Sequence, residues 1–241
     1  MKIKKIDLSR FLKLIMVEGE IQNTEAIIKI TDSCLDVFAL SPSNIFTVHG
    51  KLKGSFDWKD EIGINDLKQL IKFLNNFGDE EVLDITKKAN KLNIVSADKK
   101  LKIAFVLQSP DYIKNNISTE RFATNFKDVG EIPITLTKEI TNKIIGYCNS
   151  LGADKLNLSV NDKELTLTTD NNENSIVASF ELDLPHVPFS ISVSRNLLNI
   201  LWIISDDVLF FTTNESRNIG IVYMDDNIEF TYILAKLKIK E

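Results

Sequence analysis

Asn65-Asp66-Leu67-Lys68-Gln69-Leu70-Ile71 is a short amphipathic stretch introduced by polar residues, and the chain contains four such stretches. The others are Asp7-Leu8-Ser9-Arg10-Phe11-Leu12, Thr137-Lys138-Glu139-Ile140-Thr141-Asn142-Lys143-Ile144 and Ser194-Arg195-Asn196-Leu197-Leu198-Asn199-Ile200-Leu201. Each copy predicts a helix that a polar residue caps at its start. Successive copies begin 58, 72 and 57 residues apart. Two similar intervals around a longer one indicate a half-domain that was duplicated and then doubled across a linker, and such a repeat points to a ring.

The composition is that of an ordinary globular chain. Its 241 residues are 44% hydrophobic and 26% charged, enough for one large domain or two modest ones with a buried core. No apolar run approaches the roughly 18 residues of a membrane-spanning helix, so we expect no membrane partner. Cys34 and Cys148 lie far apart in the sequence, and we expect two reduced thiols in a cytoplasmic protein.

The net charge argues against a protein that binds nucleic acid over its whole surface. The chain carries 29 Lys and Arg residues against 34 Asp and Glu residues, which gives a net charge of −5. General affinity for DNA comes from neutralising phosphates with cations over much of a surface. The net negative charge is still compatible with a nucleic-acid-binding protein whose positive charge is confined to one concave face.

Runs rich in β-branched residues fill the intervals between the helical stretches. Tight turns such as Ser96-Ala97-Asp98-Lys99 and Val160-Asn161-Asp162-Lys163 link successive runs, so the strands are predicted to pair antiparallel. Each quarter of the chain therefore predicts a helix with several antiparallel strands, an α+β fold rather than parallel crossover units. The predicted strands are residues 26–30, 35–40, 45–52, 82–86, 91–96, 101–107, 155–160, 164–169, 175–182, 208–213, 220–224 and 230–234.

A polar and irregular segment occupies the long central interval. It predicts a connector over residues 111–133 between two similar domains, residues 1–110 and 134–241. The connector carries isolated apolar residues, among them Ile117, Phe122, Phe126 and Val129. A simple tether does not need them, so we expect the connector to lie on a sheet or to help form a binding surface.

The predicted helices combine one apolar stripe with a basic or neutral outer face. In the second helix Leu67, Leu70 and Ile71 recur at the spacing of a single helical stripe. Any one lysine on such a face can be a plain solvating residue, but acidic residues gather in the turns and the connector instead. This biased placement indicates a basic surface. Its residues are Arg10, Lys13, Lys68, Lys72, Lys138, Asn142, Lys143, Arg195 and Asn199.

The order of these elements resembles the sliding-clamp family of DNA polymerase processivity factors, of the proliferating-cell-nuclear-antigen type, with its bacteriophage and archaeal relatives. Ile30-Thr31-Asp32-Ser33, the strand 35–40, Ser43-Asn44-Ile45-Phe46 and the helix 65–74 are similar to the family's first domain. Tyr232-Ile233-Leu234-Ala235-Lys236 is similar to its closing strand, although the proline of Tyr-Leu-Ala-Pro-Lys is missing. The resemblance covers the whole chain.

The resemblance implies a homotrimeric ring whose helices line a central hole and whose sheets lie outside. The basic residues of the helices would then make weak, nonspecific contacts with duplex DNA, which let the ring slide. A replicative DNA polymerase and other DNA-processing proteins would be tethered to the ring, and a separate clamp loader ATPase would open it. The chain itself would need no cofactor. The many Lys, Ile and Asn residues hint at an AT-rich genome, and the lost proline hints at a divergent, viral or phage member. We expect a cytoplasmic protein, which for a viral member means the host cytoplasm.

Two apolar strands at equivalent places in the halves predict the subunit interface. An exposed apolar edge strand is an aggregation hazard, and head-to-tail pairing of residues 101–107 with residues 175–182 of the next subunit removes both edges. The alternative is that both strands are internal. The predicted interface residues are Leu101, Ile103, Phe105, Ile176, Ala178 and Phe180.

The resemblance also implies a groove that receives a short peptide from polymerases and clamp loaders. It would lie beneath the connector, against the sheet near the C-terminus, and would bind aromatic anchors of the peptide. By position its residues are Val37, Phe38, Leu40, Phe126, Val129, Leu234 and Ala235. For Val37 and Leu234 the alternative is a place in the core.

The sequence contains no recognisable catalytic constellation. His49 and His186 are its only histidines, no His, Cys and carboxylate cluster has metal-ligand spacing, and no glycine-rich phosphate loop occurs. We therefore expect no enzyme, no metal and no cofactor. The alternatives to an encircling clamp are a monomeric or dimeric processivity factor of the same fold and, with less support, an α+β ligand-binding protein or hydrolase.

Overall fold

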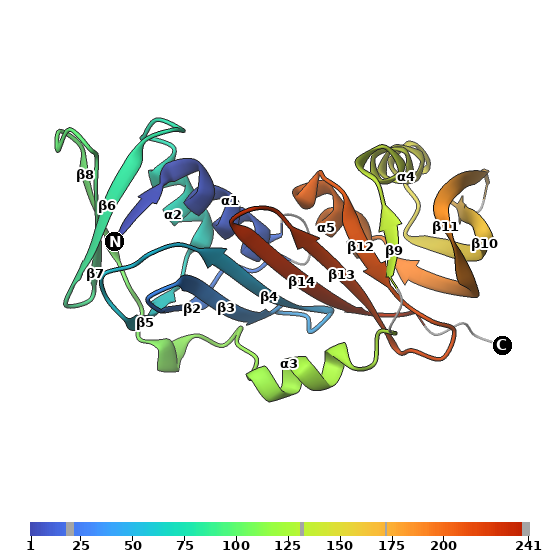
Figure 1. The fold of residues 1–241 in the computed structure, drawn as a ribbon, viewed down its shortest axis with the longest axis horizontal. Coiled ribbons are helices and arrows are strands. Elements are labelled where there is room, and N and C mark those ends of the chain that lie inside the picture. The colour runs from blue at the N-terminus through green and yellow to red at the C-terminus, as the bar shows by residue number, and fades with distance from the viewer. Residues whose placement is uncertain (18–21, 131–132, 172, 238–241) are drawn as a thin grey trace. The chain divides into compact units, whose positions relative to one another are not determined.

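The computed structural model describes residues 1–17, 22–130, 133–171 and 173–237, which fold into two compact units (Figure 1). The first unit comprises Met1–Thr119 and Met224–Phe230, and the second comprises Glu120–Tyr223 and Thr231–Glu241. The chain thus returns to the first unit for seven residues near its end. The boundaries predicted at residues 110 and 133 stay a prediction, and residues 131 and 132 of the predicted connector lie outside the described part.

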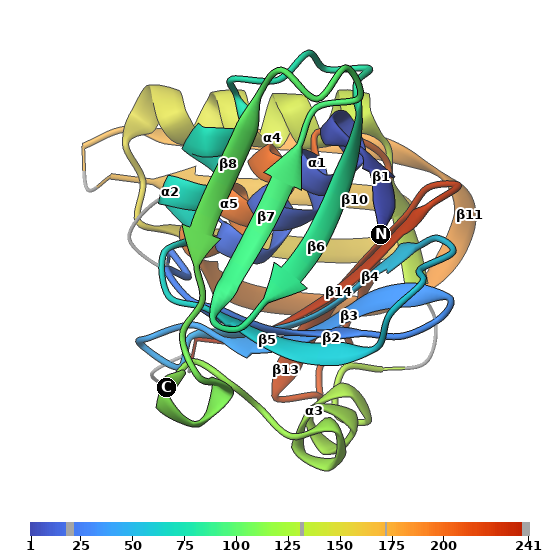
Figure 2. The same cartoon turned by 90° about the vertical axis from the view of Figure 1, so that its left-hand side faces the viewer.

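The first unit contains two helices and two antiparallel sheets. Its elements are β1 (Lys2–Lys4), α1 (Lys5–Met16), β2 (Ala26–Ile30), β3 (Cys34–Leu40), β4 (Phe46–Lys53), β5 (Asp60–Ile64), α2 (Leu67–Leu74), β6 (Val82–Lys88), β7 (Lys91–Val95), β8 (Lys102–Val106) and the 3-10 turn η1 (Pro110–Tyr112). One sheet has the order β1-β6-β7-β8, and the other runs β5-β2-β3-β4 with the start of β14 (Ile228–Ala235) beside β4. In Figure 2 the four-stranded sheet faces the viewer and α1 and α2 lie behind it.

Aromatic packing ties the helices of the first unit to its sheets. Phe11 of α1 meets Phe230 edge-on with ring centroids 5.6 Å apart, and Phe73 of α2 meets Phe105 of β8 at 6.2 Å. A Cβ atom at Gly50 would lie 2.4 Å from the Phe230 ring, so only glycine leaves room for this contact. The two helices therefore bury their apolar stripes and leave their polar faces to solvent.

The second unit repeats the combination of two helices with antiparallel strands. Its elements are α3 (Thr119–Phe126, whose first residue belongs to the first unit), β9 (Pro133–Leu136), α4 (Lys138–Leu151), β10 (Lys155–Asp170), β11 (Ser175–Ser194), α5 (Asn196–Ile204), β12 (Val208–Phe211), β13 (Asn218–Met224) and the rest of β14. The strand order is β14-β13-β12-β9, and β10 and β11 form a long two-stranded ribbon. The α+β prediction is confirmed.

All four predicted helices are present, but only two begin with a side-chain cap. The Gln69 N–H donates to Asp66 Oδ1 at 2.7 Å, and the Ile140 N–H donates to Thr137 Oγ1 at 3.3 Å. The caps expected at Asp7 and Ser194 were wrong. Asp7 lies inside the first turn of α1, and Ser194 is the last residue of β11.

The two uncapped helices follow a strand directly, and backbone carbonyls take the place of a cap. The N–H groups of Lys5 and Ile6 donate to Glu81 and Asp79 carbonyl oxygens, and the Arg195 N–H donates to the Asp154 carbonyl oxygen. Because these contacts satisfy N–H groups that a helix start otherwise leaves unpaired, no capping side chain is required.

Every predicted strand is found, with corrections at four places. Three strands were not predicted, namely β1, β5 and β9, which are only three to five residues long. The turn predicted at Val160-Asn161-Asp162-Lys163 was wrong, because β10 runs through it as one strand. The pairing with β11 shifts register on both sides of Asp162, whose φ of 54° is left-handed. Turn-forming residues therefore build a β-bulge here rather than a reversal.

The connector was predicted to be irregular, but it contains α3 and the last two residues of η1. Phe122 and Phe126 are four residues apart and lie on one face of α3. Both are among the apolar residues for which the sequence predicted a contact surface. Ile117, Phe122 and Val129 are buried. In the described residues no helix is long and apolar enough to cross a membrane.

Candidate functional site

The first unit gathers three predicted DNA-facing lysines around one hollow. The hollow lies between α1 and α2, has a volume of about 440 Å³ and is lined by Lys13, Met16, Gln22, Lys68, Ile71, Lys72 and Asn75. Lys13, Lys68 and Lys72 are exposed. Three ammonium groups around a concave surface form a local field that attracts an anion despite the negative net charge.

The local structure of α2 explains this placement. Leu67, Leu70 and Leu74 are almost completely buried, so the positions between them point outward. Lys68 and Lys72 are four residues apart and share the outer face. The only acidic residue at the start of the helix, Asp66, is occupied as the cap.

Arg10, the fourth predicted cation of this unit, is not a lining residue of the hollow. Its Nη1 lies 3.6 Å from Asp225 Oδ2, and 41% of its side chain is exposed. A long, half-exposed ion pair of this kind contributes little to stability.

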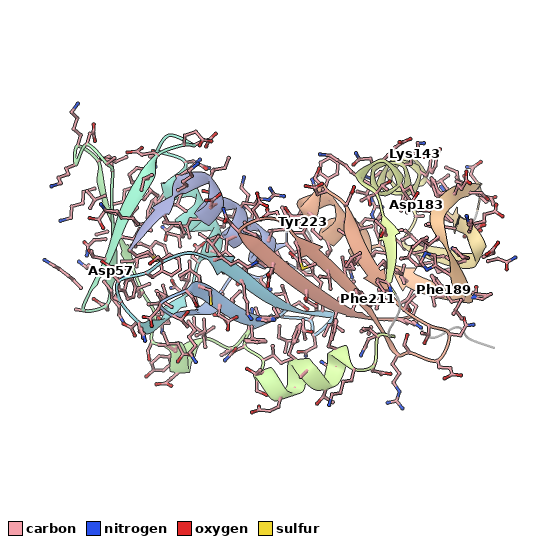
Figure 3. All side chains as sticks on the ribbon, viewed as in Figure 1. Asp57, Lys143, Asp183, Phe189, Phe211 and Tyr223 are labelled. Carbon is pink, nitrogen blue, oxygen red and sulfur yellow. The ribbon has the colours of Figure 1, made fainter. Side chains whose placement is uncertain are left out.

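The second unit brings its predicted cations to the outer faces of α4 and α5, but with internal partners. Lys138, Asn142 and Lys143 are exposed on α4, and Lys143 (Figure 3) forms an ion pair with Glu139 at 2.6 Å. The Arg195 Nη2 donates to Asn149 Oδ1 at 2.9 Å. Asn199 is half-buried. Two of the three cations of this helix pair are therefore already engaged within the unit.

The ion pair on α4 changes the pKa of both of its members. The hydrogen bond from Lys143 and its charge lower the pKa of the Glu139 carboxyl, and the same contact raises the pKa of the Lys143 ammonium. Both groups stay ionised around neutral pH. Their charges largely cancel on this part of the surface.

Two of the strands with an unpaired backbone edge in the described part of the chain carry the predicted interface residues. β8 pairs only with β7, and residues 175–182 of β11 pair only with β10. The predicted interface residues face inward on both strands: Phe105 and Phe180 are buried, and Leu101, Ile103, Ile176 and Ala178 are half-buried. Val106 and Val177 face outward and are 55% and 67% exposed. Any partner strand would therefore meet backbone groups flanked by these two valines.

In the first unit, part of the predicted partner pocket forms a surface around Phe38. Phe38 stacks on His49 with ring centroids 4.0 Å apart, and His49 Nε2 lies 2.8 Å from Asp36 Oδ1. Leu40 is half-buried beside the connector, and its N–H donates to the Asn115 carbonyl oxygen at 3.3 Å. Val37 alternates with these residues, points to the opposite face of β3 and is 1% exposed, so it is a core residue.

In the second unit, the remaining pocket residues lie in or just after α3 and at the end of β14. Phe126 is half-buried and meets Phe211 (Figure 3) edge-on with centroids 6.1 Å apart. Val129 is fully buried and touches the position of Gly220. Ala235 is exposed, whereas Leu234 next to it is 2% exposed and belongs to the core. Phe126 and Ala235 are thus the pocket residues of this unit that remain accessible.

Structural comparison decides the fold. The chain superimposes on A. fulgidus PCNA, solved with the C-terminal region of FEN-1 bound, with a TM-score of 0.79, 15% identity and coverage of 100% of this chain and 98% of that one. PCNA from Entamoeba histolytica superimposes with a TM-score of 0.78, 16% identity and coverage of 98% of each chain. The chain has the fold of a PCNA-type sliding clamp.

A third clamp structure agrees with these two, and sequence comparisons add nothing to them. A PCNA2–PCNA3 complex from Sulfolobus tokodaii matches with a TM-score of 0.76, 12% identity and coverage of 98% of this chain and 99% of that chain. No protein-family model matches the chain, and no curated protein is significantly similar to it in sequence. The resemblance to clamps is therefore visible mainly in the order and packing of the elements.

Within this clamp fold, one exposed residue escaped the sequence reasoning. Trp202 on α5 is 61% exposed, although its helix is otherwise strongly apolar. It lies seven residues after Arg195 and three after Asn199, so the three share one helical stripe. That spacing places it with two polar residues on the outer face of the helix, so the sequence could have identified it.

Proposed function

We propose that this chain is a sliding clamp: a homotrimeric ring that encircles duplex DNA and tethers a replicative DNA polymerase and other DNA-processing proteins. The observation that carries the proposal is the full-length superposition on PCNA structures, with nearly complete coverage of both chains. A shared fold does not determine a function by itself. The proposal therefore also rests on surfaces that such a ring would need.

The first such surface is the lysine-lined hollow between α1 and α2. A ring that slides requires weak phosphate contacts that are independent of base sequence, and exposed lysines on helices provide them. Persistence on DNA would come from enclosure instead of affinity. An acidic protein with a confined basic surface suits this task, because general DNA binding would stop the ring from sliding.

The second surface is the pair of open edges on β8 and β11. Antiparallel pairing of β8 with β11 of the next subunit would satisfy both edges, and repeated head-to-tail contacts close into a ring. One of the similar structures is a complex of two PCNA proteins, which supports association of chains with this fold.

The third surface would receive partner proteins. The A. fulgidus clamp is solved with the C-terminal region of another protein bound, which supports peptide docking on this fold. In this chain Phe38, Leu40, Phe126 and Ala235 are the accessible candidates for contacts with such a peptide. A clamp loader ATPase would open the ring, so the chain itself acts without catalysis or a cofactor, in the cytoplasm where the DNA is replicated.

The first test is the solution mass, measured by light scattering coupled to gel filtration over a dilution series. The proposal expects a mass about three times the 27.3 kDa of one chain. Val177→Asp should lower this mass to that of one chain, because it places a charge beside the open edge of β11. Leu184→Asp is the matched control, since Leu184 lies on the same strand, is 66% exposed and stands outside the predicted edge. A single-chain mass at every concentration would favour a non-encircling processivity factor.

A further inference from the structure

The outer face of the four-stranded sheet in the first unit is strongly basic. Residues that pair directly across antiparallel strands point to the same face, so the registers identify the outward side chains. Figure 3 shows nitrogen-tipped side chains projecting from this sheet, which Figure 2 views face-on. The outward charged residues on its strands are Lys2, Lys4, Lys88, Lys91 and Lys102, with Asp84 as the single acid. No prediction from the sequence placed a basic surface here.

A hollow of about 580 Å³ lies on this face. Lys2, Asp84, Val95 and Lys102 form one row across all four strands, because each is the register partner of the next. The hollow is lined by this row together with Val82, Ser96, Ala97 and Lys99. Val82 is 43% exposed, an unusual amount for a valine in a sheet that covers two helices. The hollow therefore combines two valines with three lysines and one carboxylate.

The three lysines of the hollow are not neutralised by ion pairs within the described residues. Nearby acids are engaged elsewhere: Glu80 pairs with Lys4 at 3.4 Å, Asp98 with Lys100 at 3.5 Å, and Asp57 with the N-terminal ammonium at 2.6 Å. Lys2 contributes to the low pKa of Asp57 only through its charge, after the N-terminal ammonium. Asp84, the register partner of Lys2, is the one acid inside the hollow.

These features fit an acidic peptide better than a nucleic acid. Single strands bind through aromatic stacking platforms beside their cations, and the outward residues of this sheet are aliphatic or polar. Valine side chains between lysines instead match a segment that alternates carboxylates with an apolar anchor.

We infer that the outer face of the sheet β1-β6-β7-β8 docks a short acidic segment of a partner protein. Its apolar side chain packs on Val82 and Val95, and its carboxylates meet Lys2, Lys99 and Lys102. All the residues belong to the first unit, and the docking needs neither a ring nor DNA. The surface is also separate from the Phe38 surface, so a clamp with this face can hold two partner segments at once.

The test is a fluorescence-anisotropy titration of the full chain with a labelled peptide of alternating glutamate and leucine. We expect saturable binding that weakens with salt, because the contacts are between exposed charges. Lys2→Glu with Lys99→Glu should lower the affinity roughly fivefold to tenfold, since each reversal replaces an attraction by a repulsion. Lys155→Glu with Lys163→Glu makes the same change of net charge on exposed positions of β10 and should leave the affinity unchanged.

Two further arms decide between occupants. Val82→Thr with Val95→Thr keeps the side-chain shape and should weaken the leucine peptide to the level of a glutamate–serine peptide, whose own binding should not change. A labelled single-stranded oligonucleotide should not compete. Equal loss in the two lysine pairs, absence of saturable peptide binding, or competition by the oligonucleotide would each overturn the inference. None of these results depends on the chain being a clamp, whose test is the solution mass.

Discussion

The helix pairs of the two units share one architecture and carry different surfaces. In the first unit, Lys13, Lys68 and Lys72 surround a hollow. In the second unit, Lys143 is held by Glu139 and Arg195 by Asn149. The apolar stripes that pack each helix onto its sheet are alike, so packing preserves the duplicated fold while exposed positions vary. The contrast teaches that the first unit should contribute most of the attraction for DNA.

The largest expected difference between the units concerns a glycine in each. Gly50→Ala should destabilise the first unit by about 2–3 kcal/mol, because the new Cβ would lie 2.4 Å from the buried Phe230 ring. Gly146→Ala in α4 meets nothing within 4 Å and should stabilise the second unit by about 0.5–1 kcal/mol. Urea unfolding curves would measure both changes. Equal effects of the two substitutions would show that the packing around Phe230 is looser than described.

The contrast in charge predicts a difference in DNA binding. Replacing Lys13, Lys68 and Lys72 by Glu should lower the affinity for a labelled duplex roughly thirtyfold or more at low salt, and reduce the salt slope by about one per lysine. The matched variant, Lys138, Lys143 and Arg195 replaced by Glu, should lose less than about fivefold, since two of its cations are already engaged. Anisotropy titrations over a salt series measure both. A larger loss in the second variant would reverse the comparison.

The capping residues provide a smaller contrast within and between units. Asp66→Ala and Thr137→Ala should each cost about 1 kcal/mol, because each leaves an N–H group of the first helical turn without its acceptor. Ser194 precedes α5, which has no side-chain cap, so Ser194→Ala should change the free energy of unfolding by less than about 0.5 kcal/mol. Thermal unfolding of the three variants separates these outcomes. A comparable loss at Ser194 would contradict the assignment of backbone carbonyls as the acceptors at α5.

The smallest effect comes from releasing the paired lysine. Glu139→Gln removes the partner of Lys143 and should raise DNA affinity about twofold, bringing the second unit closer to the first. Because the pKa of Glu139 is lowered, acidification to about pH 5 leaves the carboxylate ionised and the pair intact. The pair is lost only as the pH falls through that lowered pKa. The DNA affinity of the wild type should therefore stay constant between about pH 7 and pH 5. A wild-type affinity that rises over this range to the level of Glu139→Gln would argue against the pair as the cause of the difference.

Local rules predicted the helices and most strands, and failed where distant segments meet. The stripe Leu67, Leu70 and Ile71 and the cap at Asp66 are properties of a few neighbouring residues, so α2 could be predicted. The start of α1 could not, since its N–H groups find carbonyls of Glu81 and Asp79 far along the chain. Asp162 looked like a turn because a β-bulge uses the same backbone conformation.

The surface residues also fall into those that local spacing predicts and those that depend on contacts between distant segments. Lys13, Lys68 and Lys72 could be assigned to an outer face from helical spacing, although their gathering around one hollow depends on how α1 meets α2. Trp202 was overlooked because apolarity alone does not distinguish an exposed residue from a core one. Predicting the basic outer face of the sheet requires the register of β1 with β6. These segments are about eighty residues apart, so no local pattern contains their pairing.

The central claim is that the ring encloses DNA, and retention on closed and open DNA tests it most directly. The chain is incubated with nicked circular DNA at low salt and high protein concentration, washed in high salt and filtered to separate bound from free protein. The account predicts that protein survives the wash on circles and is lost once a restriction enzyme linearises them, because enclosure resists salt and open ends release a ring. Equal retention on circular and linear DNA would contradict it.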